Sequence, residues 1–100
     1  MAKDKGDIIS DITTYIAKFG GRYGEWYVGA STDPKQSLYT RHKVKKGDPG
    51  LLRTAHSEVQ AADVVGFFVK TYKTLGEADG VVEQGKLHVY AYRRAPYTKP

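Results

Sequence analysis

The segment Glu25-Trp26-Tyr27-Val28-Gly29-Ala30, with Asp33-Pro34 three residues further on, decides the fold class of this chain. Aromatic and β-branched side chains dominate the first segment, and such residues are typical of strands. Aspartate followed by proline is a common helix opening, because the carboxylate caps free N–H groups and proline suits the first turn. The sequence therefore predicts a strand, a short loop and a helix that runs to about Lys43.

Upstream of that strand, apolar residues recur at the spacing of one helix face. They are Ile8, Ile9, Ile12, Tyr15, Ile16 and Phe19. This pattern predicts an amphipathic helix from Asp7 to Phe19, closed by Gly20-Gly21. An alternative is a strand over residues 13–19 that turns at the two glycines into the next strand, since Thr and Tyr favour strands.

Downstream, turn residues over 45–50 predict a loop, and residues 51–55 form a short candidate strand. Ser57 and Gln60 have the spacing of a capping box, which predicts a helix through Tyr72. Glycines and acidic residues indicate a second loop over 75–85, and strict alternation predicts a final strand over 87–92. We therefore expect an α+β fold in which a small three-stranded antiparallel sheet packs with about three helices.

The bulk composition limits the class of protein. One hundred residues suit a single domain spanning 1–100, with 1–6 and 95–100 as flexible tails. The chain has no cysteine and no long apolar run, which argues against Cys-based zinc sites and a membrane partner. Its three histidines lack metal-ligand spacing, so we expect no cofactor, and a cytoplasmic location is the default. The net charge of +5 is compatible with a polyanionic partner.

The strand–loop–helix region carries a resemblance to a known family. This region resembles the second half of the GIY-YIG nuclease motif, and the resemblance is carried by the segments 26–31 and Asp33-Pro34 and by the residues Leu38 and His42. In that family a strand ending in Tyr-Ile-Gly precedes a helix with a phosphate-binding arginine, and a glutamate on a later helix binds the metal. The resemblance implies a GIY-YIG-like fold. It also implies that Tyr27 fills the second motif tyrosine and Tyr15, at a fitting spacing upstream, the first.

Two departures from that family bear on activity. Ser37 stands where the family has its arginine, and Val65 aligns with the metal-binding glutamate. Neither side chain replaces the lost group, because serine carries no cation and valine offers no oxygen ligand. The resemblance therefore implies a degenerate domain without nuclease activity. The alternative is an active Mg²⁺-dependent endonuclease with a rearranged metal site around Asp63 or Glu83.

The distribution of positive charge indicates a function that does not need catalysis. Basic residues cluster after the predicted helix, and we expect phosphates of DNA or RNA to contact Arg41, Lys43, Lys45, Lys46 and Arg53. The same cluster also suits a solvated helix end, where cations interact favourably with the helix dipole. A further alternative is a protein-interaction or structural module that binds no nucleic acid.

Overall fold

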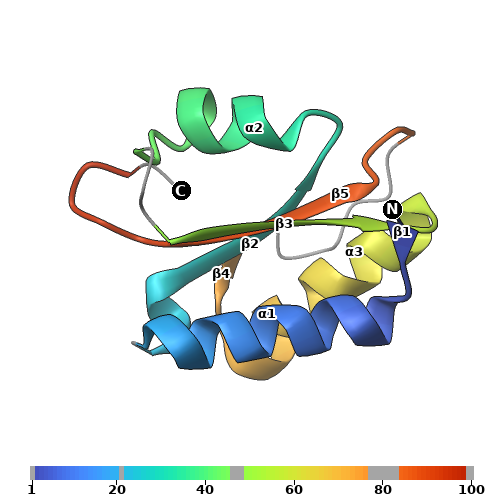
Figure 1. Cartoon of the computed structure of the whole chain (residues 1–100), viewed down its shortest axis with the longest axis horizontal. Helices are drawn as coiled ribbons and strands as arrows, with labels where there is room; N and C mark the ends of the chain where they lie inside the picture. The colour runs from blue at the N-terminus through green and yellow to red at the C-terminus, as the bar shows by residue number, and fades with distance from the viewer. Residues whose placement is uncertain (1, 21, 46–48, 77–83, 99–100) are drawn as a thin grey trace.

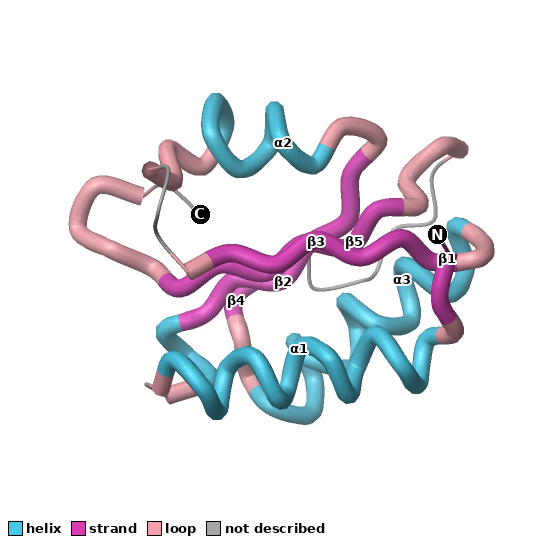
Figure 2. The backbone as a smooth tube through the Cα atoms, in the orientation of Figure 1, coloured by secondary structure: helices cyan, strands magenta, loops and turns pink. Residues whose placement is uncertain are grey.

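The computed structural model of the chain describes residues 2–20, 22–45, 49–76 and 84–98. Within these ranges the strands are β1 (Ala2–Lys3), β2 (Trp26–Ser31), β3 (Gly50–Ala55), β4 (Leu75–Gly76) and β5 (His88–Arg93). The helical elements are α1 (Lys5–Phe19), η1 (Tyr23–Glu25), α2 (Pro34–Gln36), η2 (Ser37–Arg41), α3 (Glu58–Phe67) and η3 (Phe68–Tyr72). The strands form one sheet, with α1 and α3 on one face and α2 on the other (Figure 1, Figure 2).

The sheet has five strands in the order β1-β3-β5-β2-β4. The central strands β3, β5 and β2 are antiparallel, whereas β1 pairs with β3 and β4 pairs with β2 in parallel. The expected three-stranded antiparallel sheet is therefore wrong, because the sheet is five-stranded and mixed. Both outer strands are only two residues long, one in the expected N-terminal tail and one in the expected loop. A strand this short carries no periodicity that a sequence pattern can reveal.

The N-terminal segment is a helix, and the alternative strand over 13–19 is wrong. α1 buries Ile8, Ile12 and Ile16, which lie at the four-residue spacing that places side chains on one helix face. Gly20 ends the helix with a φ of 80°, and its N–H donates to the carbonyl of Ile16 at 2.8 Å. Glycine adopts this left-handed conformation without steric cost, which explains the stop after Phe19.

The two later helices begin where the capping residues predicted and then widen into π-helical turns. Ser57 caps α3, because its Oγ accepts a hydrogen bond from the N–H of Gln60 at 3.2 Å. α2 continues as η2, in which the N–H of His42 donates to the carbonyl of Ser37 at 2.9 Å. The helix expected to reach Lys43 therefore ends at Arg41. Among the described helices, none is both long enough and apolar enough to cross a membrane.

Each face of the sheet buries its own core. The larger core lies against α1 and α3 and consists of Ile8, Ile12, Ile16, Trp26, Val28, Ala30, Ala55, Ala61, Val64, Val65, Phe68, Val89 and Ala91. The smaller core lies against α2 and η2 and consists of Tyr27, Leu38, Val44, Tyr90 and Tyr92. Successive strand residues point to opposite faces, so β2 and β5 each contribute to both cores. The smaller core fixes the position of the segment that follows β2.

Candidate nucleic-acid interface

Positive charge is densest in one stretch of the chain. Residues 34–47, which we call the basic segment, contain five Lys or Arg and no Asp or Glu. The other residues carry eleven Lys or Arg and eleven Asp or Glu, so the formal net charge of +5 equals the charge of this segment. Residues 84–100 also lack Asp and Glu and carry four Lys or Arg, so the basic segment is the denser of two acid-free stretches that could attract a polyanion.

The described part of the basic segment covers one face of the sheet. α2 and η2 lie on the face opposite α1 and α3 (Figure 1). Lys35, Lys43 and Lys45 are exposed. Lys46 lies outside the described residues, and Arg41 is described only as the last residue of η2. Lys43 and Lys45, two of the predicted phosphate contacts, are therefore on a surface that a large polyanion can reach.

Short polar contacts fix the start of the basic segment. The Oδ1 of Asp33 accepts the N–H of Gln36 at 3.2 Å, which caps the first helical turn. The Oγ of Ser31 accepts the N–H of Asp33 at 3.0 Å and lies 2.7 Å from the Oγ of Ser37. Ser37, which stands at the arginine position of the family motif, thus joins the end of β2 to η2.

His42 holds the middle of the basic segment against the sheet. The side chain is fully buried, with its Nε2 2.8 Å from the Tyr90 hydroxyl and its Nδ1 3.1 Å from the Tyr92 hydroxyl. The centroid of the Tyr27 ring lies 4.5 Å from that of the imidazole. A neutral imidazole has one donor and one acceptor nitrogen, so it can serve both hydroxyls at once. The residue directly before Lys43 is therefore anchored by β5.

The four positions that the resemblance aligns with catalytic residues of the GIY-YIG motif are divided between the two faces of the sheet. Tyr27 belongs to the smaller core, and Ser37 lies on η2 on the same side. Val65 belongs to the larger core, and Tyr15 packs against that core with its hydroxyl bonded to the backbone of Gly50. The structure therefore does not bring Tyr15 beside Tyr27. The tyrosine rings next to Tyr27 come from β5, with centroids 6.0 and 5.4 Å away.

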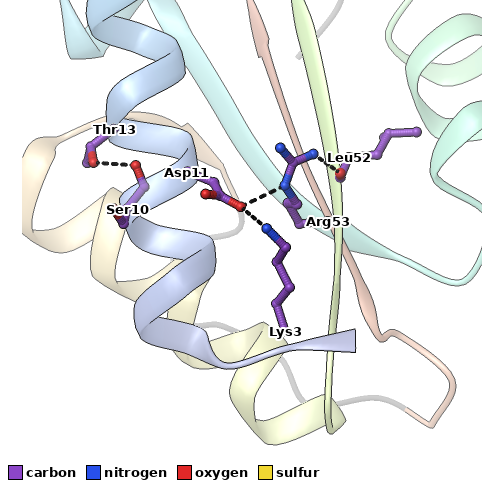
Figure 3. A network of polar contacts seen from close by, with 6 residues as sticks. All are labelled: Lys3, Ser10, Asp11, Thr13, Leu52 and Arg53. Atoms are coloured by element: carbon purple, nitrogen blue, oxygen red, sulfur yellow. Dashed lines mark hydrogen bonds and ion pairs between the residues drawn. The ribbon is translucent and has the colours of Figure 1, made fainter. Parts of the chain in front are cut away.

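Arg53 lies on the sheet face opposite the basic segment. Its Nε donates to Asp11 at 2.8 Å, and its Nη1 donates to the backbone carbonyl of Leu52 at 2.8 Å (Figure 3). The same Asp11 oxygen accepts a hydrogen bond from the Nζ of Lys3 at 2.7 Å. Arg53 thus joins β3 to α1 and does not share a surface with Lys43 and Lys45 (Figure 1).

Replacing Asp11 by asparagine is expected to lower the free energy of unfolding by about 1 kcal/mol at neutral pH, a modest loss because the ion pairs are partly exposed. Hydrogen bonds from Lys3 and then from Arg53 hold the pKa of the Asp11 carboxyl below its ordinary value. The ionised carboxylate therefore stabilises the fold above its ordinary pKa, and this contribution is lost as the pH falls through the lowered pKa. Urea unfolding across a pH series measures both effects.

Asp63→Asn is the matched control for Asp11→Asn. Asp63 pairs with Lys5 at 3.3 Å, and both side chains are about half exposed, so its removal should change the stability very little. The assigned role of Asp11 would be contradicted if both variants lost the same free energy of unfolding. It would also be contradicted if wild type and Asp11→Asn still differed in that free energy at acid pH.

The acidic residues that the sequence offers for a rearranged metal site are not assembled into one within the described ranges. Asp63 is exposed on α3 and paired with Lys5, and Glu83 lies outside the described residues. Among the residues that the structure describes, no three His, Asp or Glu side chains form a group that could hold a metal ion. The alternative of an active nuclease stays a prediction without a located site.

Sequence reasoning missed the contacts that β5 makes with the basic segment. Tyr90 and Tyr92 stand two residues apart on a strand, so they share a face, and His42 lies between that face and η2. Gly29 opposes Tyr90 across the β2–β5 pairing, and a Cβ added at Gly29 would lie 2.7 Å from the Tyr90 hydroxyl. The alternation of β5 was the available signal. Which side chain at the end of η2 meets that face of β5 depends on the tertiary packing.

No family model, no curated protein and no solved structure matches this chain. The resemblance to the GIY-YIG nucleases accordingly rests on the residues of this sequence.

Proposed function

We propose that this protein binds the sugar–phosphate backbone of nucleic acid through its basic segment and does not cleave it. The density of charge carries the proposal, because the basic segment holds a charge of +5 in fourteen residues that include no Asp or Glu. Its described part also forms a separate layer over one face of the sheet (Figure 1). Lysine and arginine contacts to phosphates release counterions and supply affinity without sequence preference. Among the predicted phosphate contacts, Lys43 and Lys45 are the exposed residues to which we assign this role.

We expect no hydrolysis, because the cation and the carboxylate that the nuclease chemistry needs are replaced by Ser37 and Val65. Ser37 contacts the hydroxyl of Ser31 at 2.7 Å and has no cation to offer a phosphate. Val65 is buried in the larger core, on the other side of the sheet from Tyr27. Charge stabilisation and metal binding by carboxylates usually supply most of the catalysis in such sites. A degenerate GIY-YIG-like domain in the cytoplasm that retains binding is therefore our working assignment.

Reversing two charges of the basic segment tests the proposal. In the double variant Lys43→Glu and Lys45→Glu, affinity for a labelled oligonucleotide is expected to fall by about tenfold or more at low salt. The slope of log affinity against log salt should also fall by about 1.5, because two phosphate contacts are lost. Fluorescence polarisation at several salt concentrations measures both quantities.

The double variant Lys70→Glu and Lys73→Glu is the matched control. It changes the net charge equally, and both residues are exposed on or directly after η3, which packs with the larger core. Lys73 has a φ of 62° and Lys43 a φ of 61°, so the two variants also share a backbone conformation. Equal losses in both variants would show that overall charge, not the basic segment, governs binding. Wild-type protein that binds no oligonucleotide at low salt would refute the proposal.

A further inference from the structure

Exposed aromatic rings occur beside the basic segment as well as in the two cores. In the described part of the chain, the large exposed apolar side chains are Phe19, Tyr39, Val59 and Tyr97. Tyr39 lies within the basic segment on η2. The ring of Tyr97 contacts the basic segment at the ammonium group of Lys45. Both tyrosines therefore accompany the cations that would hold a phosphate backbone.

Tyr39 presents its ring to solvent from a fixed position. Its residue is 48% exposed, whereas the preceding Leu38 is buried in the smaller core and fastens this turn of η2 to the sheet. No hydrogen bond or ring contact joins the Tyr39 side chain to another described residue. Lys43 follows four residues later, after His42 has anchored the chain. An aromatic ring whose backbone is held in place loses little further freedom when a flat ligand stacks on it.

Tyr97 brings a second exposed ring to the basic segment. The segment after β5 turns back towards the end of η2 (Figure 1), where the Nζ of Lys45 lies 4.2 Å from the centroid of the Tyr97 ring. The residue stays 37% exposed. This cation–π contact sets an ammonium group beside an aromatic surface, which is the combination that binds a phosphate and an adjacent base.

The form of nucleic acid follows from the shape of this surface. Bases in a duplex cover each other's faces, and their edges are reached by a helix or ribbon inserted in a groove. α2 and η2 together span only residues 34–41 and lie along the sheet (Figure 1). Exposed tyrosine rings among lysines instead suit unpaired bases, since each base has a free face on which a ring can stack.

We infer that the basic segment prefers single-stranded nucleic acid, with a base stacked on Tyr39 and phosphates held by Lys43 and Lys45. This inference rests on the proposed function and specifies its ligand. Tyr97 forms the second stacking surface beside Lys45. The sugar is not specified by stacking, so single-stranded DNA and RNA share the chemistry that is recognised.

Removal of the Tyr39 ring tests the inference in the intact chain. Four ligands are compared by fluorescence polarisation: oligothymidylate, oligouridylate, an abasic strand of equal length, and a duplex of equal length. For the wild type, we expect a base-containing strand to bind about tenfold tighter than the abasic strand and the duplex. Tyr39→Leu should bring the affinity for this strand most of the way to that for the abasic strand, because only Tyr97 is left for stacking, and Tyr39→Trp should retain the preference. Tighter binding of either oligothymidylate or oligouridylate supports the inference and identifies the sugar.

A control and two contrary outcomes separate the inference from the proposed function. Phe19→Leu removes an exposed ring from α1, so it should leave all four affinities unchanged. Equal, salt-dependent binding of strand, abasic strand and duplex, unaffected by Tyr39→Leu, would overturn the inference and leave electrostatic binding intact. Absence of binding to every ligand at low salt would overturn both. Circular dichroism establishes that each variant is folded.

Discussion

Replacing His42 by alanine is expected to lower the free energy of unfolding by about 3–5 kcal/mol, a large part of the stability of a small domain. The imidazole is fully buried, and its two nitrogens lie 2.8 and 3.1 Å from the hydroxyls of Tyr90 and Tyr92. Its loss leaves a cavity and deprives both buried hydroxyls of this partner, and each of these effects is costly. Urea unfolding monitored by circular dichroism gives the change directly.

His56→Ala provides the comparison for His42→Ala. The His56 side chain is half exposed, and its Nε2 lies 3.2 Å from Asp4, which is itself largely exposed. Its removal should change the stability by less than about 1 kcal/mol. Tyr90→Phe removes one hydroxyl without a large cavity, so its cost should lie between those of the two histidine variants. If His42→Ala were as mild as His56→Ala, the buried role of His42 in anchoring the basic segment would be refuted.

The helices and central strands were accessible to sequence reasoning because each carries a local signal. The spacing of Ile8, Ile12 and Ile16 specified the buried face of α1, and Ser57 with Gln60 specified the start of α3. The side chains of β5 alternate between the cores as the pattern of residues 87–92 predicted. Such signals depend on backbone geometry within a few residues, so a single sequence is sufficient to detect them.

The edges of the sheet were not accessible in the same way. β1 and β4 are defined by their pairing with β3 and β2, not by any property of two-residue segments. Parallel pairing at both edges requires that α1 and α3 first return the chain across one face of the sheet. Tertiary contacts therefore decide these strands, and they change a three-stranded antiparallel sheet into a five-stranded mixed one.

The candidate site shows the same division between local and long-range information. The absence of acids between Asp33 and Asp48 can be seen in the sequence, but the face on which each cation lies cannot. Arg53 was grouped with Lys43 on charge alone, yet its place on β3 directs it towards Asp11 of α1. In the same way, the spacing between Tyr15 and Tyr27 fits a family motif, while the helix places Tyr15 on the other side of the sheet.

Replacing Gly29 by alanine is expected to lower the free energy of unfolding by about 2 kcal/mol, because the added methyl group overpacks the smaller core. A Cβ at this position would lie 2.7 Å from the Tyr90 Oη, 2.8 Å from its Cζ and 3.0 Å from the Tyr27 Cε1. The buried Tyr90 ring cannot move away without disturbing its contact with His42. Thermal and urea unfolding of the variant measure the loss.

Gly66→Ala is the matched control, since the same methyl group is added where nothing lies within 4 Å. Gly66 is inside α3, so alanine should raise the stability by up to about 1 kcal/mol through its higher helix propensity. Opposite signs for the two variants would show that the close approach of Tyr90 requires a glycine in the Tyr27-Val28-Gly29 segment. Because Tyr90 contacts His42 directly before Lys43, Gly29→Ala should also weaken oligonucleotide binding where the protein is still folded. If Gly29→Ala changed neither the stability nor the binding, the claim that packing in the smaller core supports the proposed interface would be wrong.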